Sequence, residues 1–186
     1  MHYFQGEEHL INSVKRLFEI VDDKYMATTV NPKQWIFRGH SDQKYELIPG
    51  VGRLWGKTGF ETVDKIKFLE EQSLRYFRIQ TYHEIREKND FIILAVAQHH
   101  GMKTRLLDWT FSPLIALFFA VENQNDHNVN GNLYALNMDS DIVDVIKNEE
   151  KNPLDPKNIY NYLYVPFLSP RIKPNVAYFN CSRIRK

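Results

Sequence analysis

The sequence predicts a single α+β domain, with helices concentrated early in the chain and strands concentrated late. Three observations support this class. Apolar residues recur at helical spacing in several segments of the first two thirds of the chain, and short apolar or aromatic runs typical of strands dominate the last third. A chain of 186 residues with 43% hydrophobic and 25% charged residues is long and apolar enough for one folded core. We expect residues 1–30 to form an N-terminal helix and connector, and residues 31–186 to form the main domain.

The first elements follow from local patterns. Residues 8–23 are predicted to form an amphipathic helix, because apolar residues fall on one face of it at 11, 14, 17, 18 and 21. The short apolar run 34–38 predicts a buried strand that ends at Gly39. Residues 40–59 contain four glycines and the dipeptide Pro49-Gly50, which together indicate a loop with a turn.

Three helices are predicted in the middle of the chain. Residues 62–87 have one apolar and one charged side, which is typical of a long helix with a solvated face. Residues 91–99 form an apolar run that Gly101 ends. Ser112-Pro113 is a helix start, since serine caps a helix and proline suits its first position. The helix at 114–121 is apolar on every side, so we expect it to be central and buried, with Phe118 in the core.

The last third of the chain is predicted to be mostly strands. Residues 131–137 form an apolar run typical of a buried strand, and residues 162–166 and 176–184 are rich in β-forming residues. Between them, residues 139–158 are polar, and the positions of Ile142, Val143 and Ile146 indicate a short helix.

Composition excludes several classes of protein. There are 24 Lys and Arg against 23 Asp and Glu, so the chain has no global basic field for nucleic acid, although a local patch is left open. No apolar run is long enough to cross a bilayer. The single cysteine, Cys181, excludes an intrachain disulfide and zinc sites made of several cysteines. With no signal peptide in the first residues, we expect a cytoplasmic protein.

Two buried charges are the first candidates for chemistry. Arg38 comes at the end of an apolar strand, and a guanidinium group binds phosphate or carboxylate in a bidentate way. Gly39 beside it permits close approach of a backbone or a phosphate. Asp108 lies between two large apolar residues, so its carboxylate needs a partner, for which Arg38, Arg53 and Arg105 are the candidates. The alternative to a ligand site is an internal ion pair that joins two segments.

Hydroxyl and imidazole groups are the next candidates. Thr104, Thr110 and Ser112 surround the start of the helix at 114–121, and a helix start favours anions. Ser112 is better explained as the cap than as a nucleophile, because no paired base and no Gly-x-Ser-x-Gly elbow is present. His99 and His100 are adjacent and therefore a poor metal pair; one of them either orients a substrate or bonds to backbone at the helix end. No Rossmann or P-loop phosphate motif occurs.

Two long blocks resemble the FRG domain family, named after its Phe-Arg-Gly motif. The first is WIFRGH at 35–40, followed by YELIPGVGR at 45–53. The second is AQHHGMKTRLLDWT at 97–110, continued by SPLIALFFA at 112–120. Both blocks occur in the family's order, and the resemblance covers roughly residues 30–180.

The order of these elements also looks, more loosely, like the ADP-ribosyltransferase fold. That likeness implies a mixed sheet split around a cleft, in which a strand-borne arginine or histidine binds NAD and a Ser/Thr segment frames the nicotinamide. Carried over by motif, Arg38 is the first element, and Thr110 with Ser112 is the second. The late FRG pattern corresponds to 171–179, where Asn175 stands in place of glutamine and Ala177 in place of glycine. In the ADP-ribosyltransferase fold a glutamate on a late strand often completes the site. Residues 171–179 contain no glutamate, so nucleotide binding without turnover is an open alternative.

The resemblance therefore implies a nucleotide-binding, ADP-ribosyltransferase-like domain that uses NAD, with a macromolecular acceptor and a role in toxicity or phage defence. The alternative is a non-catalytic module that binds a nucleotide or a protein. A nuclease has least support, since the acidic residues are scattered. The expected catalytic residues are Arg38, Thr110 and Asn175. The expected NAD-binding residues are Arg38, Gly39, Arg53, His99, Arg105, Asp108 and Ser112, and no metal or membrane is expected.

Overall fold

The structure, a computed structural model, describes residues 8–22, 34–85, 89–122, 129–138, 142–143, 152–154, 162–165 and 175–179. Its described part is α+β, as the sequence predicts. The helices are α1 (Val14–Val21), α2 (Val63–Gln80), α3 (Asp90–His99) and α4 (Pro113–Val121), with a short 3-10 turn at Gly52–Leu54. The strands are β1 (Gln34–His40), β2 (Leu106–Trp109), β3 (Asn132–Met138), β4 (Ile142–Val143), β5 (Tyr162–Val165) and β6 (Asn175–Phe179).

The strands form two sheets rather than one. β1 and β3 make an antiparallel ribbon, with Gln34 opposite Met138 and His40 opposite Asn132. The second sheet has the order β2-β6-β5-β4, in which only the β4–β5 pair is parallel. Among the described residues, an antiparallel bridge between Phe37 and Thr110 joins the two sheets. The resemblance implies a mixed sheet that includes the Arg38 strand. Among the described residues the mixed sheet is the second one, whereas the Arg38 strand, β1, belongs to the antiparallel ribbon.

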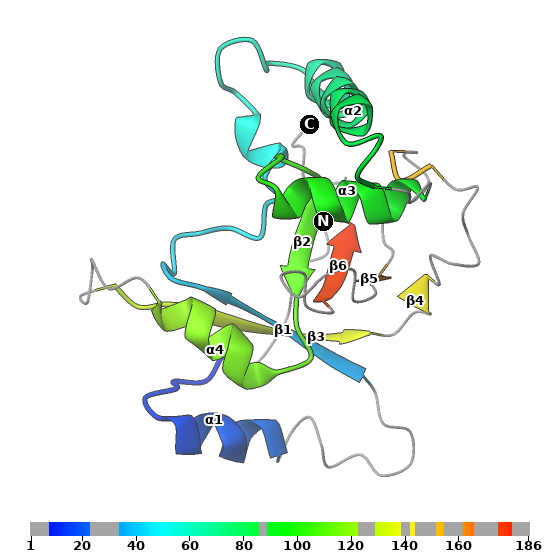
Figure 1. Ribbon diagram of the computed structural model, residues 1–186. Coiled ribbons are helices and arrows are strands. Elements are labelled where there is room, and N and C mark those ends of the chain that lie inside the picture. The colour runs from blue at the N-terminus through cyan, green and yellow to red at the C-terminus, as the bar shows by residue number, and fades with distance from the viewer. Residues whose placement is uncertain are drawn as a thin grey trace.

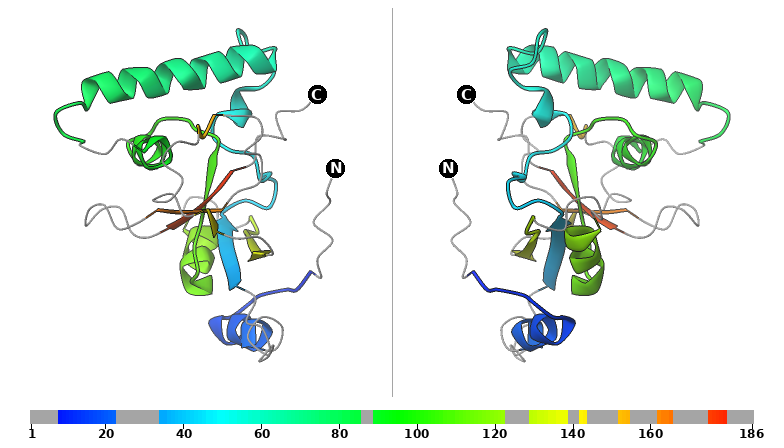
Figure 2. Two further views of the ribbon diagram at one scale, coloured as in Figure 1. Left: turned by 90° about the vertical axis from the view of Figure 1, so that its right-hand side faces the viewer. Right: turned by 90° about the vertical axis from the view of Figure 1, so that its left-hand side faces the viewer.

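The elements lie in successive layers (Figures 1 and 2). α2 lies over α3, which covers the β2/β6 part of the second sheet, and the β1/β3 ribbon comes next with α4 against it and α1 outermost. Thus β1 and β2 meet in the middle of the molecule, between the α2/α3 part and the α4/α1 part.

Capping side chains set the helix starts. The Ser13 hydroxyl accepts from the Arg16 backbone N–H at 3.1 Å, so α1 begins after residue 13 and is shorter than the predicted 8–23. Thr62 caps α2, which ends at Gln80 rather than residue 87. Asn89 caps α3 through the Phe91 N–H. The predicted start of α4 is confirmed, with Ser112 as its cap and Pro113 in its first turn.

The strand predictions are confirmed for the described residues at 34–38, 131–137, 162–166 and 176–184, with shifted ends, while residues 180–184 lie outside the described part. The helix predicted from Ile142, Val143 and Ile146 is wrong where it is described. Ile142 and Val143 pair in parallel with β5 instead, and Ile146 lies outside the described residues. A two-residue strand has too few positions for periodicity to distinguish it from a helix.

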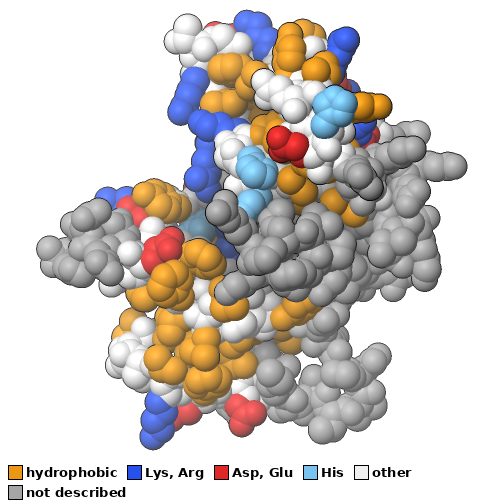
Figure 3. All heavy atoms as spheres, viewed as in Figure 1, with side chains coloured by type: hydrophobic (Ala, Val, Ile, Leu, Met, Phe, Trp, Pro, Cys, Tyr) orange, Lys and Arg blue, Asp and Glu red, His pale blue; other side chains and the backbone are white. Residues whose placement is uncertain are grey.

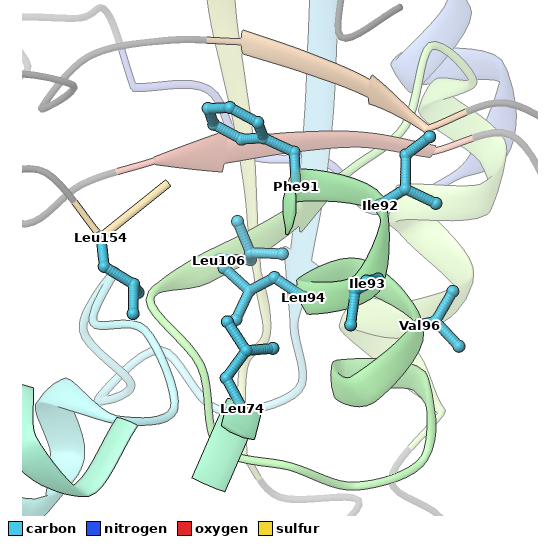
Figure 4. Packing of buried hydrophobic residues seen from close by; sticks show 8 residues of the cluster. All are labelled: Leu74, Phe91, Ile92, Ile93, Leu94, Val96, Leu106 and Leu154. Carbon is cyan, nitrogen blue, oxygen red and sulfur yellow. The ribbon is translucent and has the colours of Figure 1, made fainter. Parts of the chain in front are cut away.

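The largest core cluster surrounds α3, not α4. Leu94 is fully buried on α3 and packs with Leu74 of α2 and Leu106 of β2 (Figure 4). A second cluster lies between α1, β1 and α4 and contains Leu17, Phe37 and Ala116.

The prediction that α4 is buried on all sides is wrong. Only Ala116 and Ala120 are buried, whereas Phe118 is 60% exposed and Val121 65% exposed. Hydrophobic side chains gather over α4 on the face shown in Figure 3. The reason is a close approach of backbones: a Cβ on Gly39 of β1 would collide with the carbonyl oxygen of Ala116 and lie 2.6 Å from the backbone nitrogen of Ala120. The helix therefore turns its two small residues to the ribbon, and its large residues point away.

Candidate functional site

The bridge between the two sheets brings the candidate residues together. Phe37 donates its backbone N–H to the oxygen of Thr110 at 2.7 Å and accepts from the N–H of Thr110 at 2.9 Å. Arg38 therefore lies inside β1, one residue from this bridge, and Asp108 lies two residues before the bridge on β2. The strand continues through His40, so Arg38 is not at its end as the sequence predicts.

The guanidinium group of Arg38 is held by two protein acceptors. Its Nε donates to Nε2 of His40 at 3.0 Å, and its Nη1 donates to the backbone oxygen of Asp108. Nη2 has no hydrogen bond to any described residue. Burial lowers the pKa of Arg38, Arg53 lowers it further, and Asp108 opposes this change. The site thus holds a half-buried cation that is fixed in plane and has donors to spare.

His40 orients that guanidinium group. It is 5% exposed, and its Nδ1 lies 3.2 Å from the backbone oxygen of Tyr45. Because a carbonyl only accepts, Nδ1 carries the proton and the Nε2 lone pair accepts from Arg38. Burial lowers the pKa of His40, and the positive charges of Arg38 and Arg53 act in the same direction. The imidazole is therefore neutral at pH 7 and serves as an acceptor.

Arg53 is a second cation in the site. It lies on the Gly52–Leu54 turn, is exposed, and donates its Nε to the backbone oxygen of Ile48 at 3.0 Å. Its positive charge contributes to lowering the pKa of both Arg38 and His40. Within the described ranges, neither Arg38 nor Arg53 forms an ion pair with a carboxylate.

The carboxylate of Asp108 is held by an amide rather than by an arginine. Gln98 donates its Nε2 to Oδ1 of Asp108 at 2.7 Å. The prediction of an Asp108 salt bridge with Arg38, Arg53 or Arg105 is not met among the described ion pairs, because Arg38 is bound to the main-chain oxygen of Asp108 instead. Asp108 is open to solvent on one side, yet crowding by protein on the other raises its pKa, while Arg38, Gln98 and His99 oppose this.

Arg105 has a structural role. It is 5% exposed, and its Nε and Nη2 donate to Oε2 of Glu70 at 2.9 and 2.7 Å, while Glu70 itself is 2% exposed. The backbone N–H of Arg105 donates to the other Glu70 oxygen at 2.8 Å. This buried pair joins α2 to the start of β2 and commits the guanidinium group that the sequence analysis assigned to NAD. A ligand contact by Arg105 is not supported by this position.

Three further predicted residues build the junction with α4. Gly39 is required by the contact of β1 with α4, so the close approach it permits is that of backbone, not of phosphate. The Thr110 hydroxyl accepts from the Ser112 N–H at 3.1 Å. The Ser112 hydroxyl accepts from the Ile115 N–H at 3.4 Å, so Ser112 is the predicted cap.

His99 and Asn175 lie at the borders of the site. His99 is exposed, its ring meets that of His100 edge to face, and its charge lowers the pKa of Asp108. Asn175 begins β6, and its side chain lies outside the described residues. β6 pairs with β2 so that Val176, the residue after Asn175, is opposite Trp109, and the backbone of Asn175 is opposite Val165 of β5.

Sequence reasoning missed His40 and Gln98 as parts of the site, and it placed the Thr104 hydroxyl at the start of α4, whereas that hydroxyl bonds to Gln98. The signal for His40 was available, because it lies two residues after Arg38 and side chains two apart share one face of a strand. Gln98 and Thr104 reach Asp108 through a helix end and a loop, which no local pattern specifies.

The described residues contain no group of three or more His, Cys, Asp or Glu side chains placed to hold a metal ion. Among them, no helix combines the length and apolar character needed to span a membrane. The family model of the FRG domain matches residues 33–129, a little more than half of the chain and the part that contains nearly all of the site. Comparison with curated proteins and with solved structures gave no match.

Proposed function

The chain belongs to the FRG domain family, and we propose that within this family it binds a phosphorylated nucleotide, NAD or a fragment of it, at the Arg38 site. The observation that carries this proposal is the state of Arg38. Its guanidinium group is fixed by His40 and by the Asp108 main chain, keeps Nη2 without a partner in the described residues, and has no carboxylate ion pair there.

Electrostatics supports an anionic ligand. A half-buried guanidinium group loses hydration, and Arg53 adds a second positive charge beside it. Structural arginines in such surroundings pair with an internal acid, as Arg105 does with Glu70. Arg38 and Arg53 form no such ion pair in the described part of the chain, and the nearby Asp108 carboxylate is a single negative charge beside two cations, so a phosphate group would supply further negative charge.

Transfer of ADP-ribose to a macromolecule, and with it a role as a toxin or in phage defence, is a finer proposal. It rests on the resemblance to the ADP-ribosyltransferase fold and on the pairing of β6 with β2, in which Val176, the neighbour of Asn175, is opposite Trp109. The competing proposal is binding without turnover, favoured by the absence of a glutamate in 171–179.

Binding is tested by calorimetric titration of the protein with NAD and with ADP-ribose. Arg38→Lys keeps the charge but loses the planar fork, and the loss of one charge-assisted bond of about 1.5–3 kcal/mol predicts roughly ten- to a hundred-fold weaker binding. Because Arg38 also bonds to His40 and Asp108, a second variant is needed. Arg53→Gln removes an exposed charge and one bond to a loop carbonyl, so it should weaken binding without lowering the melting temperature.

The matched control is Arg75→Lys, since Arg75 is exposed on α2. It should bind as the unchanged protein does. A folded protein that binds neither NAD nor ADP-ribose at millimolar concentration would refute the proposal. Release of nicotinamide from NAD with an acceptor present would separate transfer from simple binding.

A further inference from the structure

The carboxylate of Asp108 has one oxygen that nothing in the described structure uses. Oδ1 accepts from Gln98, whereas Oδ2 has no hydrogen bond to any described residue. We propose that Oδ2 accepts a hydrogen bond from a sugar hydroxyl of a ligand whose phosphate lies at Arg38 and Arg53. Asp108 then selects phosphorylated sugars, including nucleotides, over other phosphates. This inference rests on the function proposed above and names what the ligand must carry besides its phosphate.

The direction of each hydrogen bond around Asp108 is fixed by the backbone. The Leu106 N–H donates to the Thr104 hydroxyl oxygen at 3.1 Å. The Thr104 hydroxyl in turn donates to Oε1 of Gln98, so the amide of Gln98 turns its NH2 group toward Asp108. Oδ1 is consequently an acceptor and carries no proton. The chain of bonds holds the carboxyl group in one orientation.

The same side chain that offers an acceptor also opposes a simple anion. The Arg38 guanidinium group bonds to the main-chain oxygen of Asp108, so a phosphate at Arg38 comes close to the carboxylate of that residue. Two like charges at short range repel each other. A ligand with a phosphate and a hydroxyl donor binds Arg38 through the phosphate and Asp108 through the hydroxyl. A phosphate without such a donor binds Arg38 but is repelled by the Asp108 carboxylate.

The second guanidinium group and this acceptor come from different elements of the fold. Arg53 comes from the Gly52–Leu54 turn, whereas Asp108 comes from β2 and is fixed from α3 through Gln98. Positive charge therefore comes from β1 and the turn, and the acceptor comes from β2. A ligand that meets both carries its phosphate and its hydroxyl on neighbouring parts, as a ribose phosphate does.

The test compares two ligands that share a phosphomonoester and differ in hydroxyl groups. Ribose 5-phosphate and methyl phosphate are titrated into the full chain and into Asp108→Asn, with binding followed by NMR chemical shifts. Asn keeps an acceptor for Gln98 but turns an NH2 donor to the ligand and removes the charge. The matched control is Asp64→Asn, an exposed residue in the first turn of α2.

We expect the unchanged protein and Asp64→Asn to bind ribose 5-phosphate at least about tenfold more tightly than methyl phosphate. In Asp108→Asn this preference should fall to near unity, while methyl phosphate binds equally well or more tightly. Weaker binding of ribose 5-phosphate without weaker binding of methyl phosphate is the signature, since a merely structural role would weaken both.

The two ligands bound equally by the unchanged protein would overturn this inference and leave the proposed function standing. That comparison needs no variant, so it decides the matter even if Asp108→Asn does not fold. A parallel loss of both ligands in a folded Asp108→Asn would also overturn it. Absence of binding for both phosphates and for NAD would refute the proposed function itself.

Discussion

Replacing Gly39 by alanine tests the packing that positions the site. A Cβ at this position would collide with the Ala116 carbonyl oxygen, lie 2.6 Å from the Ala120 nitrogen and 3.0 Å from the Ala116 carbonyl carbon. All three atoms belong to the backbone of α4, so no side-chain rotation relieves the contact. The helix must move away from β1, and the Ala116 packing in the second core cluster loosens with it.

The magnitude follows from two opposing effects. Overpacking a well-packed region costs about 1–3 kcal/mol, and the backbone contact puts Gly39→Ala at the upper end. Alanine also lowers the conformational entropy of the unfolded chain, which stabilises the folded state by about 0.4–1 kcal/mol. We expect a net loss of about 2 kcal/mol in the free energy of unfolding, or about 4–8 °C in the melting temperature for a domain of this size.

Urea unfolding followed by far-UV circular dichroism measures this loss, with Gly50→Ala as the matched control. A Cβ at Gly50 would lie 3.6 Å from the Lys103 Cα, which is an ordinary contact, so this variant should be as stable as the unchanged protein or slightly more stable. Equal urea midpoints for Gly39→Ala and Gly50→Ala would refute the close approach of α4 to β1.

Three further predictions follow from the structure. Arg105→Met leaves the buried Glu70 carboxylate without its partner side chain and should lower the free energy of unfolding by about 3–5 kcal/mol. The double variant Arg105→Met/Glu70→Leu should lose less, and urea unfolding measures both. Phe118→Ala should cost less than about 1 kcal/mol in the same assay, because the ring is 60% exposed. Burial lowers the pKa of His40 below its usual 6.5, so the unfolded chain binds the proton more readily; stability should therefore fall as the pH drops below about 6.5, and His40→Gln should flatten that part of a stability–pH curve.

Each of these has an outcome that contradicts it. Arg105→Met with unchanged stability would mean that Glu70 is solvated. A loss of 3 kcal/mol or more in Phe118→Ala, of the order typical for a core aromatic, would mean that α4 is covered. For His40, identical curves for the variant and the unchanged protein between about pH 5 and 7 would remove its neutral role beside Arg38.

The structure also shows where sequence reasoning chose the wrong partner for a charge. The sequence analysis offered Arg38, Arg53 and Arg105 as the candidate ion-pair partners of Asp108. Arg105 instead pairs with Glu70, 35 residues away on α2, and Asp108 with Gln98 on α3. Both partners, Glu70 and Gln98, are polar residues on helices, and nothing in the neighbouring sequence indicates that either one makes a buried contact. Such pairs depend on how α2 and α3 lie over β2 (Figure 2).

The sequence by itself determined the elements whose signals are local. Ser112-Pro113 fixed the start of α4, and a short apolar run around Phe37 fixed β1, because caps and short-range periodicity act within a few residues. It also determined family membership, through two blocks that carry Arg38 and Asp108. What it did not determine was burial: α3 and α4 are both apolar, and the pattern of each favours a central helix.

Only the tertiary structure decided which of the two apolar helices, α3 or α4, is buried. α4 meets β1 through Ala116 across Gly39, so its large side chains are left outside, while α3 lies between α2 and β2 and is buried. The same long-range arrangement let His40 accept a hydrogen bond from Arg38 and left the Arg38 guanidinium group without a carboxylate ion pair among the described residues. Contacts between segments far apart in the chain depend on the shape and volume of the packed whole, and a local pattern carries no information on either.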